Sequence, residues 1–256
     1  MNLFSCLVYP KINVFLKIVG KSEGYHLLNS RLCLVRGLHD VLCVKSAPKF
    51  SLKGDFDCPL AQNTLYKAWW LLKERLKPAL RSRVEGLQIE VQKQIPAGGG
   101  LGGGSADAGV FLREVNRHLD LGLDLEQLYQ IGAQVGADVN FFISGFSSAN
   151  VSHFGQIVQD FKEEPLEVKL STPPLKCVTA KVYQAFKTPT AFNPAWASKT
   201  SPELLKAYTA QELNDLYTPA LSLYPALKEH AKSLDQNYLW FFSGSGSSFF
   251  GLKGGA

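Results

Sequence analysis

The residues best suited to chemistry form a run of glycines in the middle of this 256-residue chain. Six of the seven positions from Gly98 to Gly104 are glycine, and ordering so many glycines costs backbone entropy. Bare backbone lets several N–H groups converge on one anion. Alternation predicts a strand before the run, Leu87–Val91, and helical spacing of apolar residues predicts a helix after it, Ser105–Leu119. Because a helix N-terminus attracts anions, the sequence predicts a phosphate-binding loop.

Three other interpretations of this run imply different chemistry. A flexible linker would be polar on both flanks, which Leu101 does not suit. A Walker A loop needs Lys after the last glycine, where this chain has Ser105. A dinucleotide fingerprint matches three of the glycines, although its supporting acid would fall near Asp120, between two predicted helices. A nucleotide-binding oxidoreductase therefore stays open as an alternative.

Five short motifs, spread from about Val8 to Leu252, together resemble those of the GHMP kinases, a family of small-molecule kinases. They are the phosphate loop (Pro96–Gly109), the N-terminal Lys-x-Asn strand (Pro10–Asn13), the substrate hairpin (Gly24–His26), the acidic motif (Gly136–Val139) and the third glycine motif (Ser243–Gly246). The hairpin and the acidic motif resemble one branch of the family. That branch acts on a cytidine-diphosphate-linked methylerythritol.

The resemblance implies an α+β fold of two domains, with the boundaries 1–158 and 159–256. The first would be a mixed sheet with helices, similar to domain 2 of ribosomal protein S5, and would bind ATP. The second would be smaller and ferredoxin-like. The implied reaction transfers the γ-phosphate of ATP, bound with Mg2+, to a hydroxyl of the substrate.

The resemblance assigns catalysis to Asp138 and Lys11. Asp138 would accept the proton of the substrate hydroxyl as its oxygen attacks the γ-phosphorus, a role for which an ionised Asp needs no large pKa shift. Lys11 would keep that carboxylate charged and offset negative charge around the γ-phosphate. From the residues alone, Asp138 could equally be a turn residue at a helix end, and Lys11 an outward-facing strand residue.

The implied ATP site combines the glycine loop with three residues that line the adenine pocket in the family. Its members are Pro96, Ala97, Gly98, Gly99, Gly100, Leu101, Gly102, Gly103, Gly104, Ser105, Ala106, Asn63, Leu65 and Lys93. Asn63 also suits the N-cap of a predicted helix, Thr64–Leu76. Ser105 could cap its own helix or reach the β-phosphate or a magnesium ion.

The implied substrate site consists of Asn13, Tyr25, His26, Tyr183, Gly244 and Ser245. Tyr25 would stack on the cytosine, His26 would hydrogen-bond its edge, and Tyr183 would be the second aromatic of the sandwich. Asn13 lies two residues from Lys11 and therefore points to the same face of a strand. Surface Tyr–His pairs are also common without any function. No metal ligands of the protein itself are implied.

The remaining segments mix strands and helices without strict alternation, which favours an α+β class. Predicted strands cover Val8–Val19, Arg31–Val35, Val41–Val44, Val139–Ile143, Cys177–Val182, Leu239–Phe242 and Ser248–Leu252. Further helices are predicted from Asp124 to Gly136 and over Pro202–Tyr208, Ala210–Leu216 and Pro225–Leu234.

Composition narrows the function classes. The formal charge of +5 is spread along the chain, so a nucleic-acid-binding stripe is not expected. No segment reads as a membrane span or a secretory signal, and the five scattered cysteines suit reduced thiols. We expect a cytoplasmic protein with a small-molecule substrate, no nucleic acid or membrane partner, and a monomeric or weakly dimeric state. Besides the oxidoreductase, the alternatives are a GHMP kinase of another small alcohol and an inactive nucleotide-binding module.

Overall fold

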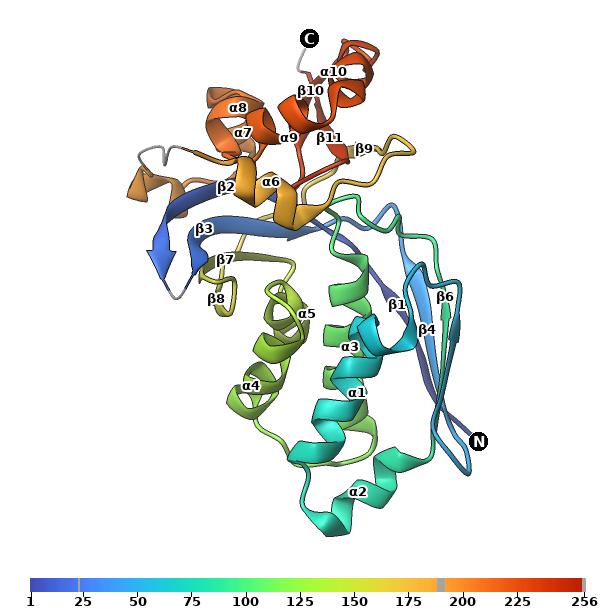
Figure 1. The fold of residues 1–256 in the computed structure, drawn as a ribbon. Helices are drawn as coiled ribbons and strands as arrows, with labels where there is room; N and C mark the ends of the chain where they lie inside the picture. The colour runs from blue at the N-terminus through green and yellow to red at the C-terminus, as the bar shows by residue number, and fades with distance from the viewer. Residues whose placement is uncertain (23, 188–191, 255–256) are drawn as a thin grey trace. The chain divides into compact units, whose positions relative to one another are not determined.

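The computed structural model describes residues 1–22, 24–187 and 192–254, and the chain divides into two compact units whose segments alternate along the sequence (Figure 1). Unit 1 consists of Met1–Pro10, Arg36–Ile95 and Gly103–Gly145. Unit 2 consists of Lys11–Val35, Pro96–Gly102 and the chain from Phe146 onward. The glycine run therefore contributes to both units. The domain boundary near residue 158 stays a prediction.

Unit 1 contains a four-stranded mixed sheet with the order β1-β4-β6-β5. The strands are β1 (Asn2–Val8), β4 (Asp40–Ser46), β6 (Leu87–Gln92) and β5 (Ser51–Gly54). The first three are antiparallel, and β5 runs parallel to β6. Inward-facing residues alternate along β4 and β6, as a sheet with one covered face requires.

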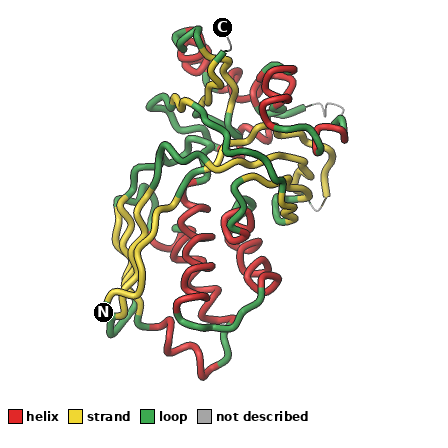
Figure 2. The backbone as a smooth tube through the Cα atoms, turned by 180° about the vertical axis from the view of Figure 1, so that it is seen from behind, coloured by secondary structure: helices red, strands yellow, loops and turns green. Residues whose placement is uncertain are grey.

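Five helices of unit 1 lie on one side of this sheet (Figure 1). They are α1 (Thr64–Arg75), α2 (Pro78–Glu85), α3 (Gly103–His118), α4 (Leu125–Val135) and α5 (Val139–Ser144), with a 3-10 turn at Leu60–Gln62. Figures 1 and 2 both show α1 and α3 along the sheet, with α4 and α5 farther from it. Asn63 caps α1, and Asp124 with Gln127 forms a capping box at α4, so the predicted helix starts are confirmed.

The predicted strand over Val139–Ile143 is wrong, because this segment forms α5. All five of its residues are buried, and a short apolar run does not distinguish a buried helix from a buried strand by periodicity. Two glycines allow the close packing. A Cβ at Gly109 of α3 would lie 2.6 Å from the Cβ of Phe142, and one at Gly132 of α4 would lie 2.2 Å from Oδ1 of Asn140.

Unit 2 contains two antiparallel sheets, with the orders β2-β3-β7-β8 and β10-β11-β9. The strands are β2 (Lys11–Ser22), β3 (Tyr25–Leu34), β7 (Ser148–His153), β8 (Ile157–Asp160), β9 (Lys169–Ser171), β10 (Tyr238–Phe242) and β11 (Phe249–Lys253). The prediction of one strand over Val8–Val19 is wrong, since the segment is divided at Tyr9 and Pro10 into β1 and β2. Proline has no N–H for a sheet ladder.

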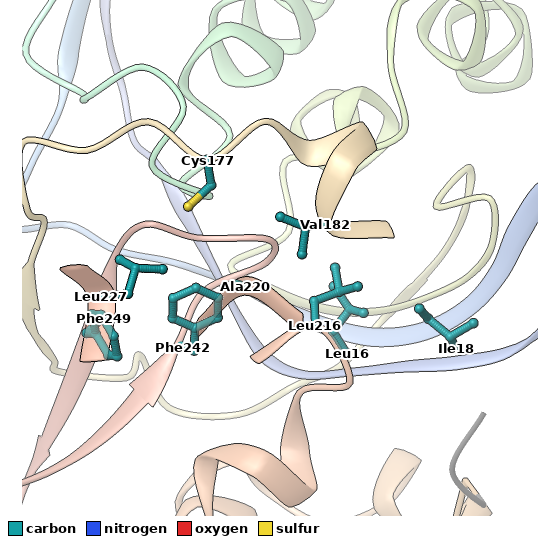
Figure 3. Close-up of a cluster of buried hydrophobic side chains, with 9 residues drawn as sticks. All are labelled: Leu16, Ile18, Cys177, Val182, Leu216, Ala220, Leu227, Phe242 and Phe249. Carbon is teal, nitrogen blue, oxygen red and sulfur yellow. The ribbon is translucent and has the colours of Figure 1, made fainter. Parts of the chain in front are cut away.

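The described residues of unit 2 form five short helices, which are α6 (Thr179–Ala185), α7 (Ser201–Ala207), α8 (Ala210–Leu213), α9 (Tyr217–Leu223) and α10 (Pro225–Lys232), with a 3-10 turn at Pro194–Ala197. Of these helices, α6, α9 and α10 pack around an apolar cluster. Figure 3 shows the cluster, in which Leu16 and Ile18 of β2 meet Val182, Leu216 and Phe242.

The predicted strand over Cys177–Val182 is also wrong, because its last four residues belong to α6. Only Cys177 and Val182 of that segment are buried, and this spacing does not suit the alternation of a strand. The α+β class is confirmed. Within the described ranges, no helix is both long enough and apolar enough to cross a membrane.

Candidate active site

Four consecutive carbonyl groups of the glycine loop accept hydrogen bonds from unit 2. The carbonyl of Gly98 accepts from the N–H of Cys177 at 3.3 Å, and that of Gly99 accepts from the N–H of Ser248 at 3.0 Å. The carbonyl of Gly100 accepts from the side chains of Ser243 and Lys11, both at 3.0 Å. The carbonyl of Leu101 accepts from the N–H of Lys11 at 3.0 Å. In a trans peptide the following N–H points opposite to the carbonyl. The N–H of each residue from 99 to 102 therefore points away from the group that holds the preceding carbonyl.

This conformation favours glycine. Gly98, Gly100 and Gly102 have φ values of 70°, 75° and 71°, which side chains disfavour. A Cβ on Gly100 would also lie 2.1 Å from the carbonyl oxygen of Ser243. The dense glycine run thus matches both the turn geometry and a close approach of two backbone segments.

Lys11 lies at the centre of a buried polar cluster in unit 2. Its Nζ donates to Oδ1 of Asn13 at 2.6 Å and to the carbonyl of Gly100 at 3.0 Å. Asn13 donates in turn from Nδ2 to Oγ of Ser30 at 2.9 Å. A Cβ on Gly244 would lie 3.2 Å from Oδ1 of Asn13 and 3.5 Å from Nζ of Lys11. The structure thus brings together residues from the phosphate loop, the Lys-x-Asn strand and the third glycine motif.

Asn214 holds the third glycine motif in place. Its Nδ2 donates to the carbonyls of Phe242 and Gly244, both at 2.9 Å, and its Oδ1 accepts from the N–H of Leu216 at 2.9 Å. Both amide hydrogens are therefore engaged. Because the Gly244 carbonyl is held, the N–H of Ser245 points to the opposite side of that peptide plane.

The predicted base-binding residues lie around the start of β3. Tyr25 is 70% exposed and makes an edge contact with Phe154, with ring centroids 6.0 Å apart. The ring of His26 lies 5.3 Å from that of Tyr183. Burial, with a contribution from Lys21, lowers the pKa of His26, which favours a neutral ring. Its buried Nε2 has no hydrogen-bond partner within the described chain.

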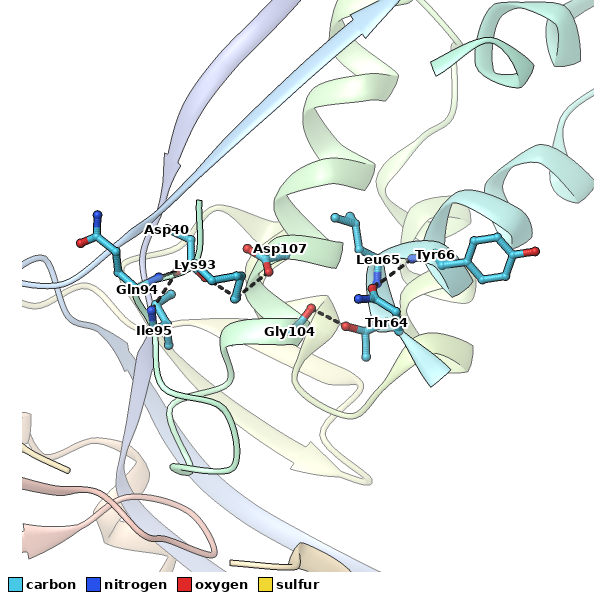
Figure 4. A network of polar contacts seen from close by, with 10 residues as sticks. Asp40, Thr64, Leu65, Tyr66, Lys93, Gln94, Ile95, Gly104 and Asp107 are labelled. Atoms are coloured by element: carbon cyan, nitrogen blue, oxygen red, sulfur yellow. Dashed lines mark hydrogen bonds and ion pairs between the residues drawn. The ribbon is translucent and has the colours of Figure 1, made fainter. Parts of the chain in front are cut away.

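In unit 1, Lys93 joins two buried carboxylates (Figure 4). Its Nζ pairs with Asp107 at 2.7 Å and also with Asp40. Asp40 accepts in addition from the N–H groups of Gln94 and Ile95. The predicted adenine-pocket lysine is therefore held by one carboxylate at the start of β4 and one near the start of α3.

One ammonium between two buried carboxylates leaves an excess of negative charge. Burial raises the pKa of Asp107 to about 7; Lys93 opposes the rise and Asp40 adds to it. The pKa of Lys93 is raised by the two carboxylates against the effect of its own burial. Oδ1 of Asp107 has no hydrogen-bond partner among the described residues.

The other two predicted adenine-pocket residues lie at the start of α1. Oδ1 of Asn63 accepts from the N–H groups of Leu65 at 2.9 Å and Tyr66 at 3.3 Å. Thr64 donates from its hydroxyl to the carbonyl of Gly104 at 2.8 Å, and Figure 4 shows this bond joining α1 to the first turn of α3. Asn63 is thus the N-cap of α1, and its place in the adenine pocket stays a prediction.

Asp138 directly precedes α5, and its side chain makes no capping hydrogen bond to that helix. A Cβ on Gly136 would lie 3.7 Å from Oγ of Ser105. Unit 1 therefore places the Ser105 hydroxyl beside the acidic motif. Lys11 belongs to the other unit, and its pairing with Asp138 stays a prediction.

Sequence reasoning missed four residues that hold the others: Ser30, Asp40, Asp107 and Asn214. Asp107 lies within the helix that follows the glycine loop, among apolar residues, and an acid in that position could have indicated a buried ion pair. Asp40 begins a strand, and Asn214 is next to an acid in a short segment between helices. No local pattern marks Ser30, because its partners come from another strand.

Comparisons with known proteins identify the class. The family described as "GHMP kinases N terminal domain" matches residues 63–150. The homoserine kinase from Cytophaga hutchinsonii has the same fold, with a TM-score of 0.61 at 17% identity over 94% of this chain and 84% of that one. The chain is a small-molecule kinase of the GHMP type.

More similar relatives define the branch. The 4-diphosphocytidyl-2-C-methyl-D-erythritol kinase of Helicobacter acinonychis (strain Sheeba) is 50% identical over 96% of this chain and 95% of its own. That of Sulfurimonas denitrificans is 44% identical over 96% and 95%. A crystal structure of 4-(cytidine 5'-diphospho)-2C-methyl-D-erythritol kinase has a TM-score of 0.77 at 30% identity over 97% of this chain and 90% of that one. The chain belongs to the family of 4-diphosphocytidyl-2-C-methyl-D-erythritol kinases.

Proposed function

We propose that this enzyme transfers the γ-phosphate of ATP to a hydroxyl of 4-diphosphocytidyl-2-C-methyl-D-erythritol, in the non-mevalonate route to isoprenoid precursors. The observation that carries the choice of substrate is the buried Nε2 of His26, which lies beside the ring of Tyr183 and has no hydrogen-bond partner in residues 1–22, 24–187 and 192–254. A neutral imidazole both donates and accepts, which suits the edge of a cytosine. Mevalonate and homoserine have no base for this pair to bind.

The glycine loop would hold the ATP phosphates through the N–H groups of residues 99–102, whose preceding carbonyls are tied to the protein. Lys11 would place its ammonium where negative charge gathers around the transferred phosphoryl group. Asp138 would orient the substrate hydroxyl and accept its proton. Positioning and charge carry most of such a reaction, because its transition state involves little covalent chemistry by the protein.

The chain offers suitable groups for Mg2+ bound with the nucleotide. Mg2+ prefers hydroxyl, carboxylate and phosphate oxygens, and Oγ of Ser105 lies beside the acidic motif that contains Asp138. When bound, the ion would neutralise part of the phosphate charge. We further propose a monomer or weak homodimer with no nucleic-acid or membrane partner. The use of ATP supports a cytoplasmic site of action.

The test is ADP release from ATP and Mg2+ with 4-diphosphocytidyl-2-C-methyl-D-erythritol, with mevalonate and homoserine as parallel acceptors. We expect ADP with the cytidylated substrate only. ADP with another acceptor would retain the kinase and reject the proposed role of His26. NADH binding without any ADP release would instead favour the oxidoreductase alternative.

A further inference from the structure

The hydroxyl of Ser30 lies between Asn13 and the backbone of β2. It accepts from Nδ2 of Asn13 at 2.9 Å and donates to the carbonyl of Phe15. Ser30 is 1% exposed and Asn13 4%, so solvent cannot replace either bond. A buried amide or hydroxyl that loses its partner is costly.

An irregularity in β2 makes this arrangement possible. Asn13 pairs with Leu32 and Phe15 with Arg31, so β2 carries one more residue than β3 between these two pairs. Such a β-bulge re-aims side chains and disturbs the ladder locally. Here the carbonyl of Phe15 accepts a side-chain hydroxyl from the neighbouring strand.

The direction of each hydrogen bond in this chain of contacts is determined. A carbonyl oxygen only accepts, so the single hydroxyl hydrogen of Ser30 must be donated to the carbonyl of Phe15. Ser30 can therefore only accept from Asn13, which requires the NH2 group of the Asn13 amide to face Ser30. The amide oxygen must then face Lys11, whose Nζ lies 2.6 Å away. Amide orientation is decided by such networks.

We propose that Ser30 is a positioning residue for phosphoryl transfer, which acts by fixing the amide of Asn13 and, through it, the ammonium of Lys11. The inference rests on the proposed function for its effect on turnover. Lys11 has a second acceptor in the carbonyl of Gly100. The Asn13 amide oxygen and the loop carbonyl both help to direct the ammonium, and displacement of the amide removes one of these two acceptors.

The first experiment compares Ser30→Ala with Ser30→Thr in steady-state assays. Ser30→Ala removes the acceptor for Asn13, and we expect kcat to fall about tenfold with the KM for ATP nearly unchanged, because a misplaced catalytic group lowers the rate of the chemical step. Ser30→Thr retains the hydroxyl and should recover kcat to within about twofold. Equal kcat for Ser30→Ala and the wild type would overturn the proposal.

Ser148→Ala is the matched control. Ser148 is another buried serine of the same sheet, but its hydroxyl donates to Glu163. We expect it to lower the melting temperature as Ser30→Ala does while leaving kcat unchanged. A double-mutant cycle then tests the route of action, since Ser30→Ala should have little further effect on kcat in an Asn13→Ala background. Fully multiplicative losses would contradict transmission through Asn13.

A readout independent of turnover keeps the test valid if the proposed substrate is wrong. The side-chain NH2 group of Asn13 should give NMR signals protected from solvent exchange in the wild type and in Ser148→Ala. In Ser30→Ala the signals should shift and exchange faster. Unchanged signals in Ser30→Ala would reject the positioning role. If the wild type releases no ADP but the Asn13 signals shift in Ser30→Ala, only the proposed function is rejected.

Discussion

Asp138 offers a test of chemistry that leaves its helix intact. Its side chain makes no capping hydrogen bond to α5, so Asp138→Asn removes the charge without removing a cap. We expect kcat to fall by at least about a hundredfold, as for loss of a proton-accepting group. ATP binding, measured by calorimetry, should stay within about threefold of the wild type because the phosphate loop is unchanged.

The control for this variant is Asp120→Asn, which makes the same change in charge at an exposed position after α3. It should leave both kcat and ATP binding unaltered. An Asp138→Asn enzyme that keeps most of its turnover would refute the assigned role.

Asp107 predicts a dependence of stability on pH. Burial raises its pKa in the folded protein to about 7 from an ordinary value of 3.8, so the folded state binds the proton more tightly than the unfolded state. The resulting stabilisation is complete below the ordinary value and is lost as the pH rises to about 7. Asp107→Asn removes this titration. We expect the melting temperature of the variant, relative to the wild type, to be higher at about pH 8 than at about pH 5.

Asp120→Asn again serves as the comparison, because it changes the same charge without burial. Its melting temperature should differ from that of the wild type by a similar small amount at both pH values. If Asp107→Asn behaves in the same way, the carboxyl does not titrate over this range in the folded protein.

At the scale of elements, the contact between α3 and α5 determines where α5 begins. A Cβ on Gly109 would lie 2.6 Å from Cβ of Phe142 and 2.7 Å from the carbonyl oxygen of Val139. Gly109→Ala should therefore displace α5 and the adjoining Asp138. We expect a loss of about 1–3 kcal/mol in unfolding free energy, typical of overpacking, together with a lower kcat. Denaturant titration and the kinase assay measure the two effects.

Gly37→Ala is the matched control, since a Cβ there would meet nothing within 4 Å. It should change neither stability nor turnover. A Gly109→Ala enzyme with reduced stability but unaltered kcat would show that α5 does not set the position of the carboxylate.

The third glycine motif depends on another single side chain. Asn214→Asp keeps the shape of Asn214 but replaces its two donated hydrogen bonds with a carboxylate facing the carbonyls of Phe242 and Gly244. We expect the KM for the acceptor substrate, 4-diphosphocytidyl-2-C-methyl-D-erythritol, to rise by about tenfold or more as this loop moves. Asn116→Asp is the control, because the Asn116 amide also donates to a backbone carbonyl, that of Leu123 at 2.9 Å, but lies outside the predicted sites. Equal effects of the two changes would argue against a role for Asn214 in holding the loop.

The elements that sequence reasoning predicted correctly carry local signals. The helix α1 begins at an N-cap, and α4 has a capping box. The glycine loop resembles the phosphate loop of the GHMP kinases over many consecutive positions. The segment that forms α5 has no such signal, because it is buried on all sides and shows no periodicity. Likewise, the contacts of Lys93 with Asp40 and of Asn13 with Ser30 join residues 53 and 17 positions apart. Only the folded chain brings them together.

At the scale of the whole molecule, unit 2 combines strands from the N-terminal part of the chain with helices from the C-terminal part. Leu16 and Ile18 of β2 contribute to the same apolar cluster as Val182, Leu216 and Phe242. Lys17, between them, forms a buried ion pair with Asp215. Asp215 also accepts from the N–H of Ile18 at 2.8 Å. The C-terminal part therefore lacks a share of its core when β2 is absent.

This arrangement predicts the behaviour of separated fragments. A break after Glu164 spares β8, which the predicted boundary at residue 158 would cut. The fragment 165–256 should not fold alone, since it would expose part of its core and leave Asp215 without Lys17, and loss of one partner of a buried pair costs about 3–5 kcal/mol. We expect poorly dispersed NMR spectra from this fragment alone and dispersed spectra after it is mixed with fragment 1–164. Cooperative thermal unfolding of 165–256 by itself would instead support an independent C-terminal domain, as the resemblance implies.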